Sequence, residues 1–108
     1  MELYHTTDTE GVSELNPETG RMREILARLD EPGAEDPEHP DVTLVHDPSG
    51  WAASVYPSGI ITLENFEDED EPPRHLPGMS RHEALTLWTK LARGEIEAVK
   101  AYPWRSPE

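Results

Sequence analysis

The fold is decided by residues 42–65, which read VTLVHDPSGWAASVYPSGIITLEN. Two copies of one reversal, DPSG at 47–50 and YPSG at 56–59, divide this stretch into three short runs rich in β-branched and aromatic residues. In each copy, proline presets φ at the second turn position, and glycine accepts the left-handed conformation that closes a type I turn with a bulge. The stretch therefore predicts a three-stranded antiparallel meander.

The same turn chemistry predicts how the three strands pair. When the first turn residue faces the residue four positions on, Asp47 faces Trp51 and Tyr56 faces Ile60. Because neighbours along a strand alternate between faces, this register predicts two different surfaces. The apolar face, which should meet the helices, carries Val45, Trp51, Ala53, Val55, Ile61 and Leu63. The opposite, mixed face carries Val42, Leu44, His46, Ala52, Ser54, Tyr56, Ile60, Thr62 and Glu64.

One helix is predicted before the meander in the sequence and another after it. Between residues 22 and 29, apolar side chains recur at the i, i+3, i+4, i+7 spacing of one helix face, with Asn16 as the expected N-cap. Ser80 and Glu83 have the spacing of a capping box, and Gly94 is the expected stop of this second helix.

The remaining segments complete a single α+β domain covering residues 1–108. Residues 2–7 are predicted to form a short strand and residues 95–101 a short helix. The segments 31–41 and 67–79 are rich in acidic residues and proline, so they are predicted to be acidic loops. The expected fold is an antiparallel meander of three to four strands with two or three helices packed on one face.

The chain is strongly acidic, with 23 Asp and Glu residues against 9 Lys and Arg and a formal net charge of −14. This exceeds the charge of roughly 2–8 units that suffices to keep a small domain soluble. Between Arg28 and Arg74 there are thirteen acidic residues and no Lys or Arg. Such a surface repels nucleic acid and anionic membranes, so we expect neither as a partner and favour a basic protein.

Several classes of chemistry lack a sequence signal. The absence of cysteine excludes disulfides, thiolate zinc sites and thiol nucleophiles. The five histidines have no metal-site spacing, and no glycine-rich phosphate loop is present, so no metal and no cofactor are expected. Without a signal-peptide pattern or an apolar run of about 20 residues, the expected location is the cytoplasm.

One group of side chains has the composition of a catalytic site. His46, Ser54 and Glu64 share the predicted mixed face and suggest a base, a nucleophile and an orienting carboxylate. The predicted register separates His46 from Glu64 by two strands, about 9–10 Å between backbones, which is too far for a direct hydrogen bond. A hydrolase therefore ranks last, and we predict that the chain is not an enzyme.

Protein binding is the leading expectation. The candidate partner-binding residues are loop carboxylates and two residues of the mixed face: Glu35, Asp36, Glu38, Tyr56, Glu64, Glu67, Asp68, Glu69, Asp70 and Glu71. Together they would steer and dock a basic protein, although such an acidic run is often only a solvated loop. The alternative is a homodimeric assembly module that buries the mixed face, with Val42, Leu44, Tyr56 and Ile60.

The layout as a whole resembles the small acidic bacterial immunity proteins of polymorphic toxin systems. The resemblance is carried by the order of a short strand, a helix, a meander starting at Gly50 and Trp51 with a turn at Gly59, a capped helix and a terminal Pro103-Trp104. It implies a cytoplasmic inhibitor that binds a cognate toxin, often a nuclease or deaminase with a basic cleft, and blocks that cleft. It assigns no functional residue in this chain.

Overall fold

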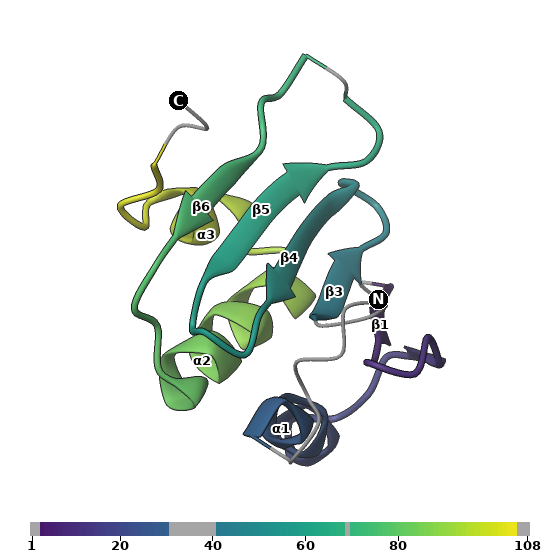
Figure 1. Cartoon of the computed structure of the whole chain (residues 1–108). Coiled ribbons are helices and arrows are strands. Elements are labelled where there is room, and N and C mark those ends of the chain that lie inside the picture. The colour runs from purple at the N-terminus through teal and green to yellow at the C-terminus, as the bar shows by residue number, and fades with distance from the viewer. Residues whose placement is uncertain (1–2, 31–40, 69, 106–108) are drawn as a thin grey trace.

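The computed structural model describes residues 3–30, 41–68 and 70–105 (Figure 1). Within them the elements are β1 (Tyr4–Thr7), β2 (Ser13–Leu15), α1 (Thr19–Ala27), the 3-10 turn η1 (Arg28–Asp30), β3 (Val42–His46), β4 (Trp51–Val55), β5 (Ile61–Asn65), β6 (Arg74–Leu76), α2 (Arg81–Ala92) and α3 (Ile96–Lys100). The strands form one antiparallel sheet in the order β2-β1-β3-β4-β5-β6. The predicted α+β fold is confirmed, with more strands than expected.

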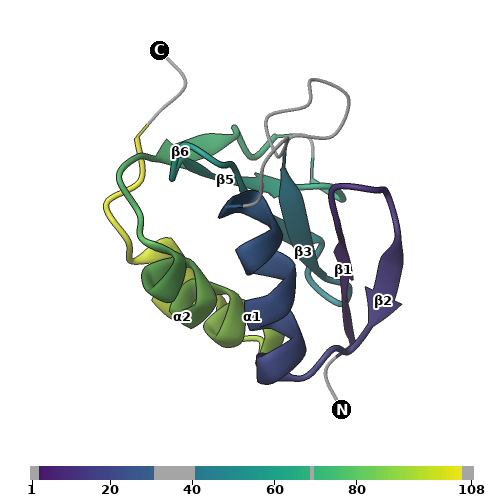
Figure 2. The same ribbon diagram turned by 60° about the horizontal axis from the view of Figure 1, so that its bottom comes forward.

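The molecule has two layers, because the three helices lie on the same face of the sheet (Figures 1 and 2). The core between the layers includes Trp88, which is fully buried and donates its indole N–H to the carbonyl of Ala53 at 3.1 Å. The sheet contributes Val42, Leu44, Trp51, Ala53, Val55, Ile61 and Leu63 to this core. No helix of the described residues covers the other face of the sheet, which we call the open face.

The β4–β5 hairpin has the predicted register, but the β3–β4 hairpin is shifted by one residue. Tyr56 N–H donates to the carbonyl of Ile60 at 2.9 Å, and Ala53 pairs with Leu63 as expected. In the first hairpin, His46 rather than Asp47 is opposite Trp51.

The shift has a long-range cause. Asp47 N–H, which would close the expected turn, donates instead to the carbonyl of Leu3 next to β1, at 2.9 Å. Trp51 N–H donates to the hydroxyl oxygen of Ser49 at 3.3 Å. The four residues 47–50 therefore all belong to the turn, and Gly50 closes it with φ of 78°.

A shift of one residue moves every side chain of a strand to the other face. Val42 and Leu44, expected on the mixed face, are fully buried in the core. Val45, expected in the core, is instead on the open face opposite Ala52. His46, also expected on the mixed face, lies on the core face opposite Trp51, whereas Ala52 and Glu64 pair with each other on the open face.

The helix ends differ in how well local sequence defines them. The capping box of α2 is present, with the Ser80 hydroxyl accepting Glu83 N–H and the Glu83 carboxylate accepting Ser80 N–H, both at 3.1 Å. Gly94 follows α2 with φ of 76°, as expected for a stop. Asn16 is not the cap of α1, which begins after Glu18. The side-chain oxygen of Asn16 instead accepts Tyr4 N–H at 2.8 Å, which holds the start of β1 in place.

Strands β2 and β6, at the two edges of the sheet, were not expected. β6 lies inside the segment 67–79 that was predicted to be an irregular loop. Its outer side pairs with the C-terminal segment, because His75 and Arg105 exchange backbone hydrogen bonds of 3.0 and 2.8 Å. That segment also brings Trp104 against the core.

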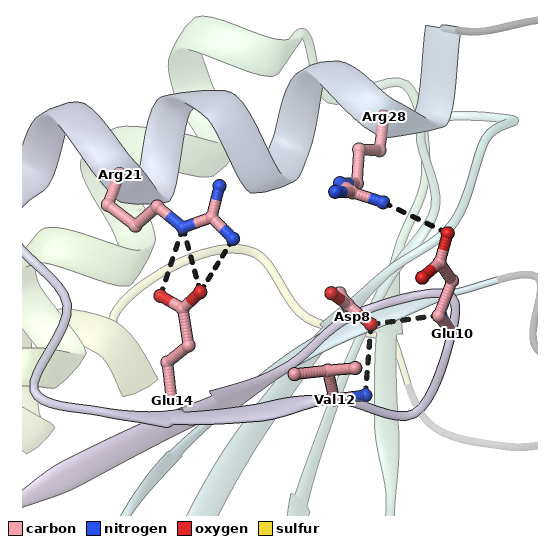
Figure 3. Close-up of polar contacts among 6 residues, drawn as sticks. All are labelled: Asp8, Glu10, Val12, Glu14, Arg21 and Arg28. Atoms are coloured by element: carbon pink, nitrogen blue, oxygen red, sulfur yellow. Dashed lines mark hydrogen bonds and ion pairs between the residues drawn. The ribbon is translucent and has the colours of Figure 1, made fainter.

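The β1–β2 hairpin is tied to α1 and η1 by ion pairs (Figure 3). Arg21 donates from two nitrogens to the Glu14 carboxylate at 2.6 to 3.0 Å, and this contact lowers the pKa of Glu14. Arg28 lies 3.4 Å from Glu10. The Asp8 carboxylate accepts two backbone N–H groups of the connecting turn. The acidic residues of this hairpin are thus partly neutralised within the fold.

Candidate functional site

The open face of the sheet presents a row of small polar side chains that crosses all six strands. Strand pairing aligns Ser13, Thr7, Thr43, Ser54, Thr62 and His75 in this row. Neighbouring hydroxyls bond within it, at 3.1 Å between Thr7 and Ser13 and 2.8 Å between Thr43 and Ser54. The row gives the open face a flat, hydrogen-bonding centre.

Apolar side chains are exposed near this polar row. Leu15, on the same face of β2, has 69% of its surface exposed, and Phe66, which follows β5, has 60% exposed. Ile60 is exposed at the other end of β5. Aromatic and aliphatic groups of this kind, beside hydrogen-bonding groups, are common anchors of protein interfaces.

Charge divides unequally between the two layers. Among the described residues, the helical segments 18–30 and 80–101 carry seven basic and six acidic side chains. The rest, made of strands and their connections, carries two basic and ten acidic side chains. The helical layer is therefore close to neutral, whereas the sheet layer holds most of the negative charge.

Part of that charge is concentrated where β5 leads into β6, at a feature we call the acidic edge: Glu64, Glu67, Asp68, Asp70 and Glu71. Of these, Glu71 is paired with Arg74 at 2.8 Å. Within the described part of the chain, the other four carboxylates have no cation within ion-pair distance, and all four are exposed.

The backbone of the acidic edge is held in place by Asn65. Its side-chain oxygen accepts the N–H groups of Glu67 and Asp68, each at 2.9 Å, and its amide donates to the carbonyl of Ser49 at 3.1 Å. The Asp68 carboxylate in turn accepts Asp70 N–H at 3.0 Å. These contacts join the loop to the β3–β4 turn and limit the freedom of its first residues.

The two predicted acidic loops are not brought together. Asp41 precedes β3 and lies at the end of the sheet where β5 begins, whereas Glu67 follows β5 at the opposite end. The predicted partner-binding residues Glu35, Asp36, Glu38 and Glu69 fall outside the described residues. Among the described residues, the predicted site therefore consists of the acidic edge and Tyr56.

Tyr56, a further predicted site residue, is half-buried at the end of β4 on the open face. Burial, and then the charges of Asp41 and Glu64, raise its pKa above the ordinary value, while a hydrogen bond with Thr62 acts in the opposite direction. The phenol therefore stays protonated at neutral pH. It offers a neutral hydroxyl close to carboxylates, a suitable partner for a mixed polar and basic surface.

The candidate catalytic trio is not assembled. Ser54 and Glu64 belong to the open face, whereas His46 is opposite Trp51 on the core face and is only 4% exposed. Its Nδ1 lies 2.7 Å from the hydroxyl of Ser49, in the turn that follows β3.

Sequence reasoning missed two features of this surface. The continuous row of Thr and Ser residues becomes visible only with the observed register, because the expected one put Thr43 on the other face. A cationic pocket formed by Arg74, Lys100 and Arg105 was also missed, because Arg74 is distant in sequence from the other two and the pairing of the C-terminal segment with β6 brings them together. No local motif could have revealed that pocket.

The described residues contain no group of three or more His, Asp or Glu side chains arranged to hold a metal ion. No helix among them is both long enough and apolar enough to cross a membrane. The chain matches no protein-family model, no curated protein and no solved structure.

Proposed function

We propose that this chain is an acidic protein-binding module that inhibits a basic partner, such as a toxin, by docking on it through the acidic edge and the adjoining open face. The separation of charge between the two layers is the observation that carries the proposal. A large excess of negative charge on one side orients a basic partner during approach and raises the rate of encounter.

The chemistry of the open face fits the second stage, in which the encounter becomes a stable complex. Phe66, next to the acidic edge, supplies exposed apolar area, and the row through Thr43 and Thr62 supplies donors and acceptors. Long-range attraction fixes the orientation, and short-range contacts slow dissociation. An acidic run that served solubility alone would not require an exposed apolar and hydrogen-bonding surface next to it.

The test compares two variants with equal changes of charge. The first neutralises the acidic edge through Glu64→Gln, Glu67→Gln, Asp68→Asn and Asp70→Asn. The control neutralises four exposed carboxylates of the helical layer through Glu18→Gln, Glu24→Gln, Glu95→Gln and Glu97→Gln. Both variants have a formal charge of −10, so a difference between them reports the position of the charge and not its amount.

A basic partner would be captured from an extract of the source cells at low salt and its association rate measured with each variant. We expect the acidic-edge variant to associate at least about tenfold more slowly at low salt than the control, with a smaller dependence on ionic strength. Equal rates for the two variants would refute the electrostatic docking. A captured partner whose activity is unchanged by saturating amounts of the chain would refute the inhibitory role.

A further inference from the structure

A pocket with the opposite charge lies between β6 and the C-terminal segment, next to Glu71 at the end of the acidic edge. Its volume is roughly 310 Å³, and its lining is Pro72, Arg74, Lys100, Tyr102, Pro103, Trp104 and Arg105. Three of the nine Lys and Arg residues of the chain converge here, in a protein that carries a surplus of fourteen negative charges. A cavity of this size suits a small ligand.

Two of the three cations lie over the same aromatic ring. The Arg74 guanidinium carbon and the Lys100 ammonium each lie 5.4 Å from the centre of the Trp51 ring, so they are separated by no more than twice that distance. Among the described residues, Arg74 has Glu71 as a carboxylate partner, whereas no carboxylate lies within ion-pair distance of Lys100 or Arg105. Among the residues that the structure describes, Lys100 and Arg105 therefore bring two positive charges to the pocket without a carboxylate partner.

The walls of the pocket are held by contacts that do not depend on a ligand. The Trp104 indole N–H donates to the carbonyl of Val99 at 2.8 Å, and the Lys90 ammonium donates to the Tyr102 hydroxyl at 3.3 Å. The backbone of Arg105 is fixed by its pairing with His75. Because these groups are already positioned, a ligand loses little of its binding free energy to ordering them.

We propose that this pocket binds the phosphate monoester of a small organic molecule, with Lys100 and Arg105 contacting the phosphate and the rings of Tyr102 and Trp104 contacting the body of the molecule. A phosphate monoester carries a charge of about −1.5 to −2 at neutral pH, which matches the two uncompensated cations, whereas a carboxylate would neutralise one of them. A guanidinium and an ammonium are both common phosphate-binding groups.

The ligand class is tested by titrating the intact protein with three probes, phenyl phosphate, inorganic phosphate and benzoate, followed by tryptophan fluorescence and calorimetry. The titrations are carried out at about 0.15 M salt. At this ionic strength, exposed charges more than about 8 Å from the probe are largely screened, so the acidic surface repels the probes less. We expect saturable binding in the order phenyl phosphate, inorganic phosphate, benzoate. Absence of saturable phenyl phosphate binding, or benzoate binding as tightly, would overturn the proposal.

Variants locate the site. Lys100→Gln and Arg105→Gln should each weaken phenyl phosphate binding about tenfold or more, because each removes a charge-assisted contact. Arg93→Gln, an exposed helical residue outside the pocket lining, makes the same change of charge and should leave binding unchanged. Equal losses in all three variants would show a general charge effect and contradict the assignment.

A fourth variant separates binding from a structural role of these cations. Glu71→Gln removes the carboxylate that competes for Arg74, so it should tighten phenyl phosphate binding several-fold. If the cations only stabilised the C-terminal segment, this change would not increase affinity for the probe. Unchanged or weaker binding by Glu71→Gln would count against the pocket as a phosphate site.

Discussion

Replacing Leu44 and Val45 one at a time by alanine distinguishes the observed register of β3 from the one that turn chemistry predicts. Leu44 is fully buried between the sheet and the helices, and Val45 is on the open face. Leu→Ala changes in packed cores cost about 3–5 kcal/mol, because a cavity remains in addition to the lost burial. Val45 lies on the open face but is only 7% exposed, so Val45→Ala, which removes two buried carbon atoms, should cost about 1.5 kcal/mol.

The assay is urea unfolding followed by tryptophan fluorescence, with the slope of the transition checked for constancy. For a chain of this length, a loss of 1 kcal/mol lowers Tm by about 4 °C, so Leu44→Ala should lower it by about 12 °C or more. The expected register reverses the order, because it places Val45 inside and Leu44 outside. A cost for Val45→Ala that equals or exceeds the cost for Leu44→Ala would refute the assignment of the open face.

Three further predictions concern the turn, the capped helix and the core. Gly50→Ala should destabilise the fold by about 1–2 kcal/mol or more, because φ is positive and the new Cβ would approach two atoms to 2.9 Å. Gly20→Ala, in the first turn of α1 with no atom near the new Cβ, should instead stabilise the fold by about 0.5 kcal/mol. Equal effects of the two substitutions in thermal unfolding would contradict this prediction. The backbone N–H and then the hydroxyl of Ser80 lower the pKa of Glu83, so this carboxylate stabilises the fold above its unfolded pKa of about 4.3, and the benefit disappears as pH falls through the lower folded value. The urea midpoints of the unmodified chain and Glu83→Gln should therefore converge between about pH 6 and about pH 3, and a gap that stays constant would exclude this linkage. Trp88→Phe should cost about 2–3 kcal/mol, because it deprives the buried Ala53 carbonyl of its indole donor, and a loss below about 1 kcal/mol in chemical unfolding would show that this hydrogen bond matters little.

Local sequence predicted elements whose signals are complete within a few residues. The Ser80 capping box, the Gly94 stop and the YPSG hairpin depend only on their own neighbours, and all three form as expected. The DPSG turn has the same pattern and a different register, because Asp47 is engaged by Leu3, more than forty residues away. Identical local chemistry thus gives two results when a distant strand competes for one N–H group.

The candidate site shows the same division between local and distant information. The acidic run and the lack of Lys and Arg between residues 28 and 74 can be counted directly in the sequence. Whether those carboxylates gather depends on strand order, which places Asp41 and Glu67 at opposite ends of the sheet. The pocket of Arg74, Lys100 and Arg105 depends on the C-terminal segment returning to pair with β6, which no periodicity predicts.

The backbone pairing of His75 with Arg105 has a practical consequence for anyone who shortens the chain. An unpaired edge strand can form backbone hydrogen bonds with another polypeptide, and the pairing of His75 with Arg105 covers part of this edge of the sheet. A protein truncated after Trp104 would lose the pairing with Arg105 and expose the outer side of β6 to other molecules in solution. Such a truncation is a poor starting point for crystallisation, since self-addition of molecules along that edge would compete with ordered growth.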